Sequence, residues 1–227
     1  MSKLINKVPD FLYKPAAINA KLLPKIQKEC LELFKKMNQI AEKKNKGAYY
    51  VRLQDKNDLC VNIAKYCPVL TLELKRLKIF HLFNALLFLQ TAPSDIVIDM
   101  PIHRDYNLDN KYIFGHFGLN IPVVGCENTY TVFYTGDVDK HKQWSDDIVG
   151  TNNALLAELA DENTIIEIDR IESNRPLWIN NYAWHKAEYT LGTNRMLLSI
   201  RFEDMQPLFD NDYFDEYLVA KETTLTK

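Results

Sequence analysis

The sequence of 227 residues is poor in glycine and cysteine and carries almost no net charge. Its seven glycines form no Gly-rich phosphate-binding loop, and its four cysteines form no Cys-x-x-Cys pair. Scattered thiols of this kind predict buried, reduced cysteines in a cytoplasmic protein rather than a disulfide framework or a zinc site. Lys and Arg number 28 against 30 Asp and Glu, so a net charge of −2 gives no electrostatic basis for binding nucleic acid.

Long apolar segments are also absent. The first residues, MSKLINKVPDF, contain no apolar run like that of a signal peptide, and no stretch reaches the roughly 18 consecutive apolar residues of a membrane-spanning helix. The length suits a single domain with a substantial core. We therefore expect one cytoplasmic domain over residues 1–227 that binds neither membrane nor nucleic acid. The sequence leaves its oligomeric state open.

Three regions of the chain differ in pattern. Residues 1–92 predict supporting helices, because apolar residues recur at steps of three and four over 21–44, and a more apolar helical stretch follows over about 70–90. Residues 93–205 consist of short apolar or alternating segments separated by Gly, Pro and Asn, which is typical of the strands and turns of a β-sandwich. Residues 206–227 predict a short terminal helix and tail.

The most informative residues are His103 and Asp105, followed 80 positions later by His185 (185 − 105). Side chains at i and i+2 of a strand point to the same face, so His103 and Asp105 can reach one ion while Arg104 points away. His185 is then expected to return through the fold as the third ligand. Two imidazoles and one carboxylate leave three positions of an octahedral metal open, which is the geometry of non-haem Fe(II) oxygenases.

The same segment also imitates the catalytic loop of a protein kinase. In HRDYNLDN (103–110), Asp105 takes the place of the catalytic base and Asn110 that of the magnesium ligand. The rest of the chain does not fit a kinase, because a Gly-rich loop is lacking. The nearest match to Asp-Phe-Gly is His116-Phe117-Gly118, which has no metal-binding aspartate. The sequence therefore argues against a kinase.

The segment around His185 predicts two strands and a turn. His185 is expected near the end of one strand and Arg195 at the start of the next, with the turn-like residues 191–194 between them. Over 195–202 the even positions are all apolar, whereas the polar groups stand at odd positions. One face of this strand is therefore expected to pack in a core while the other lines a cavity.

With these features the chain resembles the 2-oxoglutarate/Fe(II)-dependent dioxygenases, and among them the small aspartyl/asparaginyl-hydroxylase-like and phage-encoded members. The resemblance covers roughly residues 95–203. The family has an Asn-Ile-Pro strand after the first histidine, which is matched by Asn120-Ile121-Pro122, and then an aromatic-rich strand, which is matched by residues 130–134. Its carboxyl-terminal pattern of Ile-Asn, His, Arg and Ser-Ile-Arg-Phe is matched by Ile179-Asn180, His185, Arg195 and residues 199–202.

The resemblance implies a ligand set for the iron. His103, Asp105 and His185 would bind Fe(II), and Arg195 would pair with the distal carboxylate of 2-oxoglutarate. An arginine suits that task because its planar fork grips a carboxylate with two parallel hydrogen bonds.

The chain departs from the family beyond this arginine. Many members place Ser or Thr two residues after it, where this sequence has Leu197. Either Ser199 or Arg201, further along the same face, is then expected to complete the 2-oxoglutarate anchor. Asn120 and Tyr134 are further candidates for lining the pocket.

The resemblance also implies a fold and an activity. The expected fold is mainly β, a double-stranded β-helix (jelly roll, cupin-like) with N-terminal helices packed on one sheet and a short C-terminal helix. The expected reaction uses O₂ and 2-oxoglutarate to hydroxylate a small-molecule or peptide substrate, and it releases succinate and CO₂. Because Asp105 fills the position that halide takes in halogenase relatives, hydroxylation is favoured.

Two other functional classes remain open. The first is a cupin-type metalloenzyme that does not use 2-oxoglutarate, which an assay for succinate release distinguishes. The second is a non-catalytic jelly-roll protein with a binding or structural role, which iron titration distinguishes. The sequence does not identify the substrate.

Overall fold

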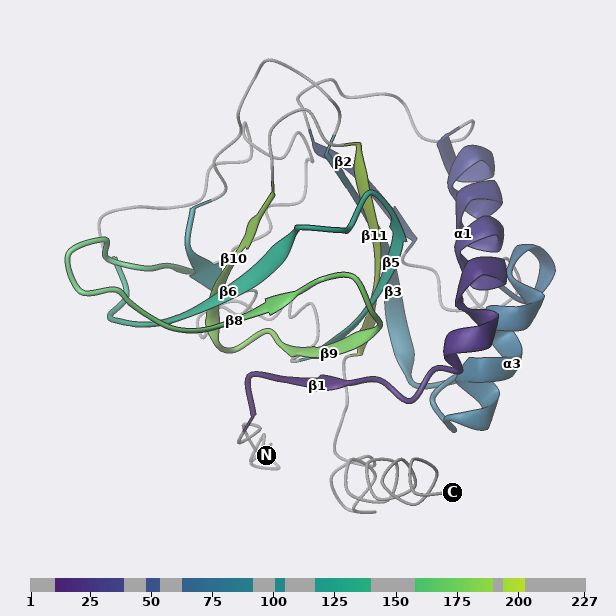
Figure 1. Ribbon diagram of the computed structural model, residues 1–227, viewed down its shortest axis with the longest axis horizontal. Coiled ribbons are helices and arrows are strands. Elements are labelled where there is room, and N and C mark those ends of the chain that lie inside the picture. Colours follow the sequence, from purple (N-terminus) through teal and green to yellow (C-terminus); the bar gives the residue numbers. More distant parts are fainter. Residues whose placement is uncertain are drawn as a thin grey trace, which may run out of the picture.

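The computed structural model describes residues 11–38, 48–53, 63–91, 101–104, 117–139, 158–189 and 194–202. This part of the chain is mainly β, with two antiparallel sheets that face each other (Figure 1). Helices α1 and α3 lie on the outer side of one sheet (Figure 1). The mainly β class predicted from the sequence is confirmed, and the two sheets are compatible with a β-sandwich.

The larger sheet has six antiparallel strands. In spatial order they are β1 (Tyr13–Pro15), β9 (Leu177–Asn180), β5 (Phe117–Val124), β11 (Arg195–Phe202), β3 (Phe83–Thr91) and β2 (Ala48–Leu53). Strand β11 is central and pairs over nearly its full length with both β5 and β3. Its side chains therefore have defined neighbours on both sides.

The smaller sheet has five antiparallel strands. In spatial order they are β7 (Glu158–Leu159), β4 (His103–Arg104), β10 (Trp184–Glu188), β6 (Tyr130–Thr135) and β8 (Ile166–Glu172). Strands β9 and β10 are joined by the short turn at residues 181–183, so the chain passes from the larger sheet to the smaller one immediately before His185.

The helices cover the outer face of the larger sheet. A 3-10 turn at Ala20–Leu22 leads into α1 (Leu23–Asn38), whose apolar face joins a core with α3 (Pro68–Arg76) and the sheet. Two polar contacts fix this arrangement. Gln27 Nε2 donates to the carbonyl of Pro122 at 3.1 Å, and the Glu29 carboxylate accepts the backbone N–H of Val69 at 3.0 Å. A carboxylate at the first turn of α3 also complements the helix dipole.

The two faces of β11 have different neighbours. Its even residues belong to the core beneath the helices: Met196, Leu198, Ile200 and Phe202. Its odd residues point the other way, toward the smaller sheet, because side chains of a strand alternate between faces. All eight residues of β11 are buried. The alternation predicted for residues 195–202 therefore separates two buried faces, one that carries the polar groups toward the smaller sheet and an apolar one toward the helices.

The helix predicted over about 70–90 is wrong in its second half. Helix α3 ends at Arg76, Lys78 adopts a positive φ of 57°, and the chain then enters β3 at Phe83. The stripe that suggested a helix ran through Leu77, Phe80, Phe83, Asn84 and Leu87. These residues form a strand because they pair with β11 and β2, which are distant in sequence, and such tertiary context overrides a local helical pattern.

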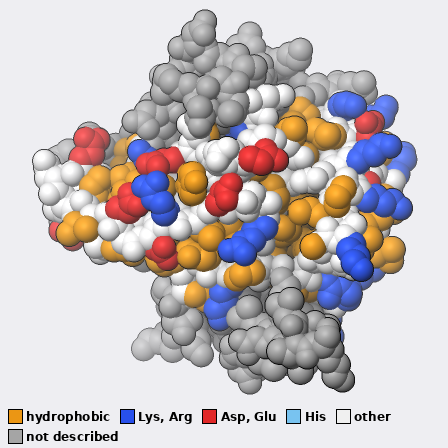
Figure 2. Space-filling view, in the orientation of Figure 1, with side chains coloured by type: hydrophobic (Ala, Val, Ile, Leu, Met, Phe, Trp, Pro, Cys, Tyr) orange, Lys and Arg blue, Asp and Glu red, His pale blue; other side chains and the backbone are white. Residues whose placement is uncertain are grey.

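The described cysteines and the surface add to this picture. Cys30, Cys67 and Cys126 are buried free thiols, as predicted. None of the described helices has the length and hydropathy needed to cross a membrane. On the face seen in Figure 2, basic side chains gather over α1 and α3, whereas acidic and basic side chains mix over the smaller sheet. The predicted terminal helix after residue 205 lies outside the described residues.

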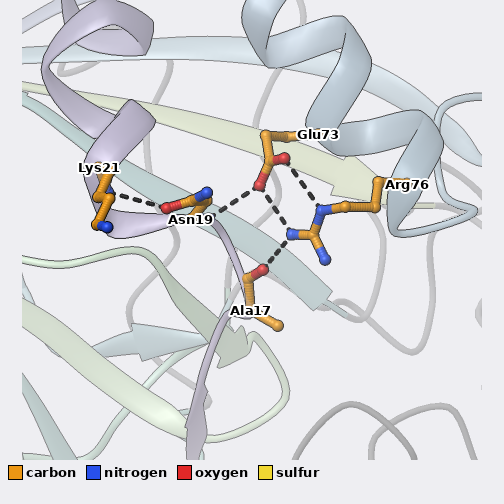
Figure 3. A network of polar contacts seen from close by, with 5 residues as sticks. All are labelled: Ala17, Asn19, Lys21, Glu73 and Arg76. Carbon is orange, nitrogen blue, oxygen red and sulfur yellow. Dashed lines mark hydrogen bonds and ion pairs between the residues drawn. The ribbon is translucent and has the colours of Figure 1, made fainter. Parts of the chain in front are cut away.

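A buried carboxylate ties the amino-terminal segment to α3 (Figure 3). Glu73 is 5% exposed and accepts hydrogen bonds from the backbone N–H of Asn19 at 2.8 Å and from Arg76 Nε at 3.0 Å. Arg76 also donates to the carbonyl of Ala17. The hydrogen bond from Arg76, together with that from Asn19, lowers the pKa of Glu73 despite its burial.

We expect Glu73→Gln to destabilise the protein in a pH-dependent way. The folded pKa of Glu73 lies below its ordinary value of 4.5, so the ionised group stabilises the fold above that pH, and the contribution is lost as the pH falls through the folded pKa. At pH 7 the free energy of unfolding should drop by about 1–3 kcal/mol, the cost of breaking hydrogen bonds to a buried charged group. Urea unfolding between pH 7 and pH 3 measures it.

The difference in unfolding free energy between Glu73→Gln and the wild type should become smaller toward pH 3. A difference that stays constant with pH would contradict the role assigned to the ionised Glu73. Glu32→Gln serves as the control. Glu32 forms an exposed ion pair with Lys35 at 2.9 Å, and its replacement should change the free energy of unfolding little.

Candidate functional site

Two histidines from distant parts of the sequence lie side by side on the smaller sheet. His103 on β4 is directly opposite His185 on β10. Their ring centroids are 4.7 Å apart, and the ring planes are inclined by 48°. Both side chains are buried, with 6% and 8% of their surface exposed. Residues directly opposite each other in an antiparallel pair share a face of the sheet, so both imidazoles project to the same side.

The protonation of both rings follows from their hydrogen bonds. His103 Nδ1 lies 2.9 Å from the carbonyl oxygen of Pro101, and His185 Nδ1 lies 2.9 Å from that of Ala183. A carbonyl oxygen can only accept, so each neutral ring carries its hydrogen on Nδ1 and its lone pair on Nε2. This arrangement, with Nδ1–H held by a backbone carbonyl, is the usual way in which metal-binding histidines are oriented.

The histidines belong to a row of residues that crosses the smaller sheet. His185 is opposite His103 on one side and Phe133 of β6 on the other, and Phe133 is in turn opposite Asp169 of β8. The rings of Phe133 and His185 have centroids 6.4 Å apart. With strands about 4.8 Å apart, the row runs from the buried histidines to an exposed carboxylate over three strand spacings.

A second row on the larger sheet faces the first. In this row Ile179 of β9 is opposite Tyr13 of β1 and Gly118 of β5, and Gly118 is opposite Arg201 of β11. Ile179 packs with Phe133 in a small core between the sheets. Phe133 of the histidine row and Ile179 of the second row therefore meet between the two sheets.

Tyr13 joins the two rows at their edge. Its ring stacks on that of Phe133 with centroids 5.7 Å apart, so it links β1 to β6. Burial raises the pKa of Tyr13, and the neighbouring Asp169 raises it further. The phenol therefore stays protonated over the physiological range.

Around Gly118 the polar side chains of the larger sheet converge. A Cβ on Gly118 would lie 3.1 Å from Ser199 Oγ, 3.2 Å from Asn120 Oδ1 and 3.5 Å from Arg201 Cζ. Ser199 Oγ donates to Asn120 Oδ1 at 2.6 Å. The missing side chain of Gly118 thus lets Ser199, Asn120 and Arg201 approach the backbone of β5 closely.

Arg195 lies at the other end of β11. It is 5% exposed and stands six residues before Arg201 (201 − 195), which corresponds to about 20 Å along a strand. Burial lowers the pKa of Arg195, whereas the nearby Cys126 and Tyr189 raise it. Both arginines occupy odd positions of β11 and face the smaller sheet.

The structure brings the predicted site residues together in two separate groups. His103 and His185 lie side by side on the smaller sheet. Asn120, Ser199 and Arg201 meet around Gly118 on the larger sheet. Arg195 lies at the other end of β11. His185 is the second residue of β10 and lies at its beginning, whereas the sequence placed it near a strand end.

Two predicted residues are not part of either group. Asp105 lies outside the described residues. Tyr134 is opposite Trp184 and neighbours the inward-facing Phe133, so it lies on the outer face of the smaller sheet. Within the described part of the chain, no set of three or more His, Cys, Asp or Glu side chains is arranged to hold a metal, and the expected third ligand is outside that part.

Four site residues were missed by sequence reasoning: Tyr13, Gly118, Phe133 and Asp169. Gly118 and Phe133 sit in the segments that the resemblance covers, but only the strand registers show that they neighbour Arg201 and His185. The sequence around Tyr13 and Asp169 did not indicate that they lie near the histidines, because their positions depend on pairing between strands far apart in the sequence.

The paired histidines could contribute two ligands to a divalent transition ion such as Fe²⁺ through their Nε2 atoms. The buried guanidiniums of Arg195 and Arg201 are suited to binding carboxylates. No protein-family model and no curated protein matches this chain.

We expect His103→Ala and His185→Ala each to weaken the binding of Co(II) by more than about tenfold. Loss of a ligand should cost more than the 10–100-fold lost when a residue that merely supports a ligand is changed. Calorimetric titration and the ligand-field absorption of Co(II) measure the effect. His81→Ala is the control, because His81 is exposed and stacks only on the edge of Phe80. Wild-type affinity in both site variants would refute the assignment.

Proposed function

We propose that the chain is an Fe(II)- and 2-oxoglutarate-dependent oxygenase that hydroxylates a small-molecule or peptide substrate and releases succinate and CO₂. The observation that carries the proposal is the pair His103 and His185, directly opposite each other with both Nδ1 atoms bonded to backbone carbonyls. The geometry supplies two of three ligands, and Asp105 is proposed as the third because it follows His103 at the spacing that shares a strand face.

The proposed fold is a double-stranded β-helix, or jelly roll. Two facing antiparallel sheets support it, because a jelly roll encloses its cavity between two sheets. The functional groups divide between the sheets in the same way. The histidines project from the smaller sheet, and the arginines project from β11 of the larger sheet.

The protein's own residues position the reactants. When bound, Fe(II) and 2-oxoglutarate supply the oxidation of a substrate C–H bond by O₂, with decarboxylation of 2-oxoglutarate providing two of the electrons. His103 and His185 hold the ion through Nε2 and keep their Nδ1 protons on carbonyls throughout. Phe133, Leu177 and Ile179 form a small buried apolar cluster, and the ring of Phe133 neighbours that of His185. They exclude water from this side of the site.

One of the two arginines is proposed to hold the distal carboxylate of 2-oxoglutarate, because six residues, or about 20 Å along a strand, separate them and one ligand cannot reach both. Arg195 is the proposed partner, as the resemblance to the dioxygenases implies. Arg201 is the alternative. Either Ser199 or Arg201, which lie two residues apart on the same face of β11, is proposed to complete the anchor.

The proposed function is tested by measuring succinate release from the purified protein with Fe(II), O₂ and 2-oxoglutarate across pooled substrate classes. Succinate should form only with all three components, and His185→Ala should abolish it. If the protein binds Fe(II) but neither binds nor consumes 2-oxoglutarate, it is instead a metalloenzyme of another type. If it binds no metal, the site has a non-catalytic role.

The arginine assignment predicts separable effects on ligand and metal. Arg195→Leu should raise the Kd for 2-oxoglutarate by one to three orders of magnitude, because losing one partner of a buried, hydrogen-bonded charge pair costs about 2–5 kcal/mol. Anaerobic titration of the Fe(II)-loaded protein, followed by its visible absorption, measures this Kd.

Fe(II) affinity should survive in Arg195→Leu. Arg195→Lys, which keeps the charge but loses the two-pronged fork, should give an intermediate Kd. Unchanged 2-oxoglutarate affinity in Arg195→Leu, together with its collapse in Arg201→Leu, would move the distal anchor to Arg201.

A further inference from the structure

On the outer face of the smaller sheet, the sequence neighbours of the two histidines also meet. Arg104 follows His103, and Trp184 precedes His185, so both point away from the site. Arg104 Cζ lies 4.6 Å from the centroid of the Trp184 ring, within the range of a cation–π interaction. We infer that this stack positions His103 opposite His185 for metal binding. The inference rests on the proposed metal site.

Strand β4 needs such a support because it is very short. It consists of His103 and Arg104 alone, it meets β10 through the single pair His103 and His185, and its other neighbour, β7, also has two residues. A strand with so few ladder hydrogen bonds has a weakly specified register. A slip by one residue would turn His103 to the outer face and Arg104 to the inner face.

The stack opposes that slip. Arg104 can lie over Trp184 only while both side chains are on the outer face, and this is the register in which both imidazoles are on the inner face. The cation–π contact outside and the histidine pair inside therefore require the same pairing of β4 with β10.

Trp184 is itself fixed in place. It is 7% exposed, and its Nε1–H donates to the carbonyl of Gly136 at 2.9 Å. Gly136 directly follows β6, the strand that pairs with β10 on the side away from β4. The indole is thus attached to the β6–β10 pair, and Arg104 attaches β4 to the indole.

The same sheet offers a matched control. Arg170 of β8 lies over the Tyr130 ring at 5.8 Å and also on the outer face, but neither residue is next to a histidine in sequence. Arg170→Ala removes a comparable cation–π contact from the sheet, together with ion pairs to Glu167 and Glu188. A general loss of sheet stability should therefore affect both arginine variants.

The test compares Co(II) binding and thermal unfolding of the full chain in the wild type, Arg104→Ala, Arg104→Lys and Arg170→Ala. Arg104→Ala should raise the Kd for Co(II) about 10–100-fold, as for other residues that orient a metal ligand, and it should alter the ligand-field spectrum. Arg104→Lys, which keeps a cation for the ring, should recover most of the affinity. Arg170→Ala should bind Co(II) like the wild type, even where its metal-free Tm falls as far as that of Arg104→Ala.

Trp184→Phe provides a second variant, since it retains a ring beneath Arg104 but loses the donor to Gly136, and its Kd should lie between those of the wild type and Arg104→Ala. Wild-type Kd and spectrum in Arg104→Ala would overturn the inference. An equal loss of affinity in Arg104→Ala and Arg170→Ala would also overturn it, because the effect would then be general destabilisation. Failure of the wild type itself to bind Co(II) would instead refute the metal site on which the inference rests.

Discussion

The pairing of β4 with β10 is the constraint on which the candidate site depends. Each histidine is oriented locally, by a carbonyl two residues earlier in its own chain segment. Their approach is not local, since it requires His103 and His185 to stand opposite each other across two strands. Short-range hydrogen bonds therefore orient each imidazole ring, whereas the register of β4 on β10 brings the two rings close together. A shift of one residue in this register would separate the rings and leave each local hydrogen bond possible.

The larger sheet shows a second division of tasks, between the two faces of β11. Its even face contributes apolar side chains to the core under α1 and α3. Its odd face places Arg195, Ser199 and Arg201 between the sheets, where burial of polar groups opposes folding unless they are satisfied. An apolar inner face would cost less, and the proposed binding of 2-oxoglutarate accounts for the arginines there. Ser199 and Asn120 offset part of the cost by bonding to each other.

Strand alternation was predictable from the sequence because it is local, and for residues 195–202 it assigned each side chain to the correct face. The two histidines and the arginines could be singled out by residue type and spacing. The error over residues 70–90 has the opposite cause: β3 is a strand because it pairs with β11 and β2, which are distant in sequence, and this non-local pairing overrides the local pattern. Gly118, Phe133, Asp169 and Tyr13 could not be predicted, because they become neighbours of the site only through registers between distant strands.

The inner and outer faces of the smaller sheet are coupled by the same alternation. His103 and Arg104 are consecutive, so whatever fixes the face of one fixes the face of the other. Arg104 over Trp184 and His103 beside His185 are therefore two consequences of one pairing. A two-residue strand gains from this coupling, because contacts on both of its faces favour the register that its few backbone hydrogen bonds specify weakly. The outer face of the sheet thus contributes to the geometry of the site without any residue of that face entering it.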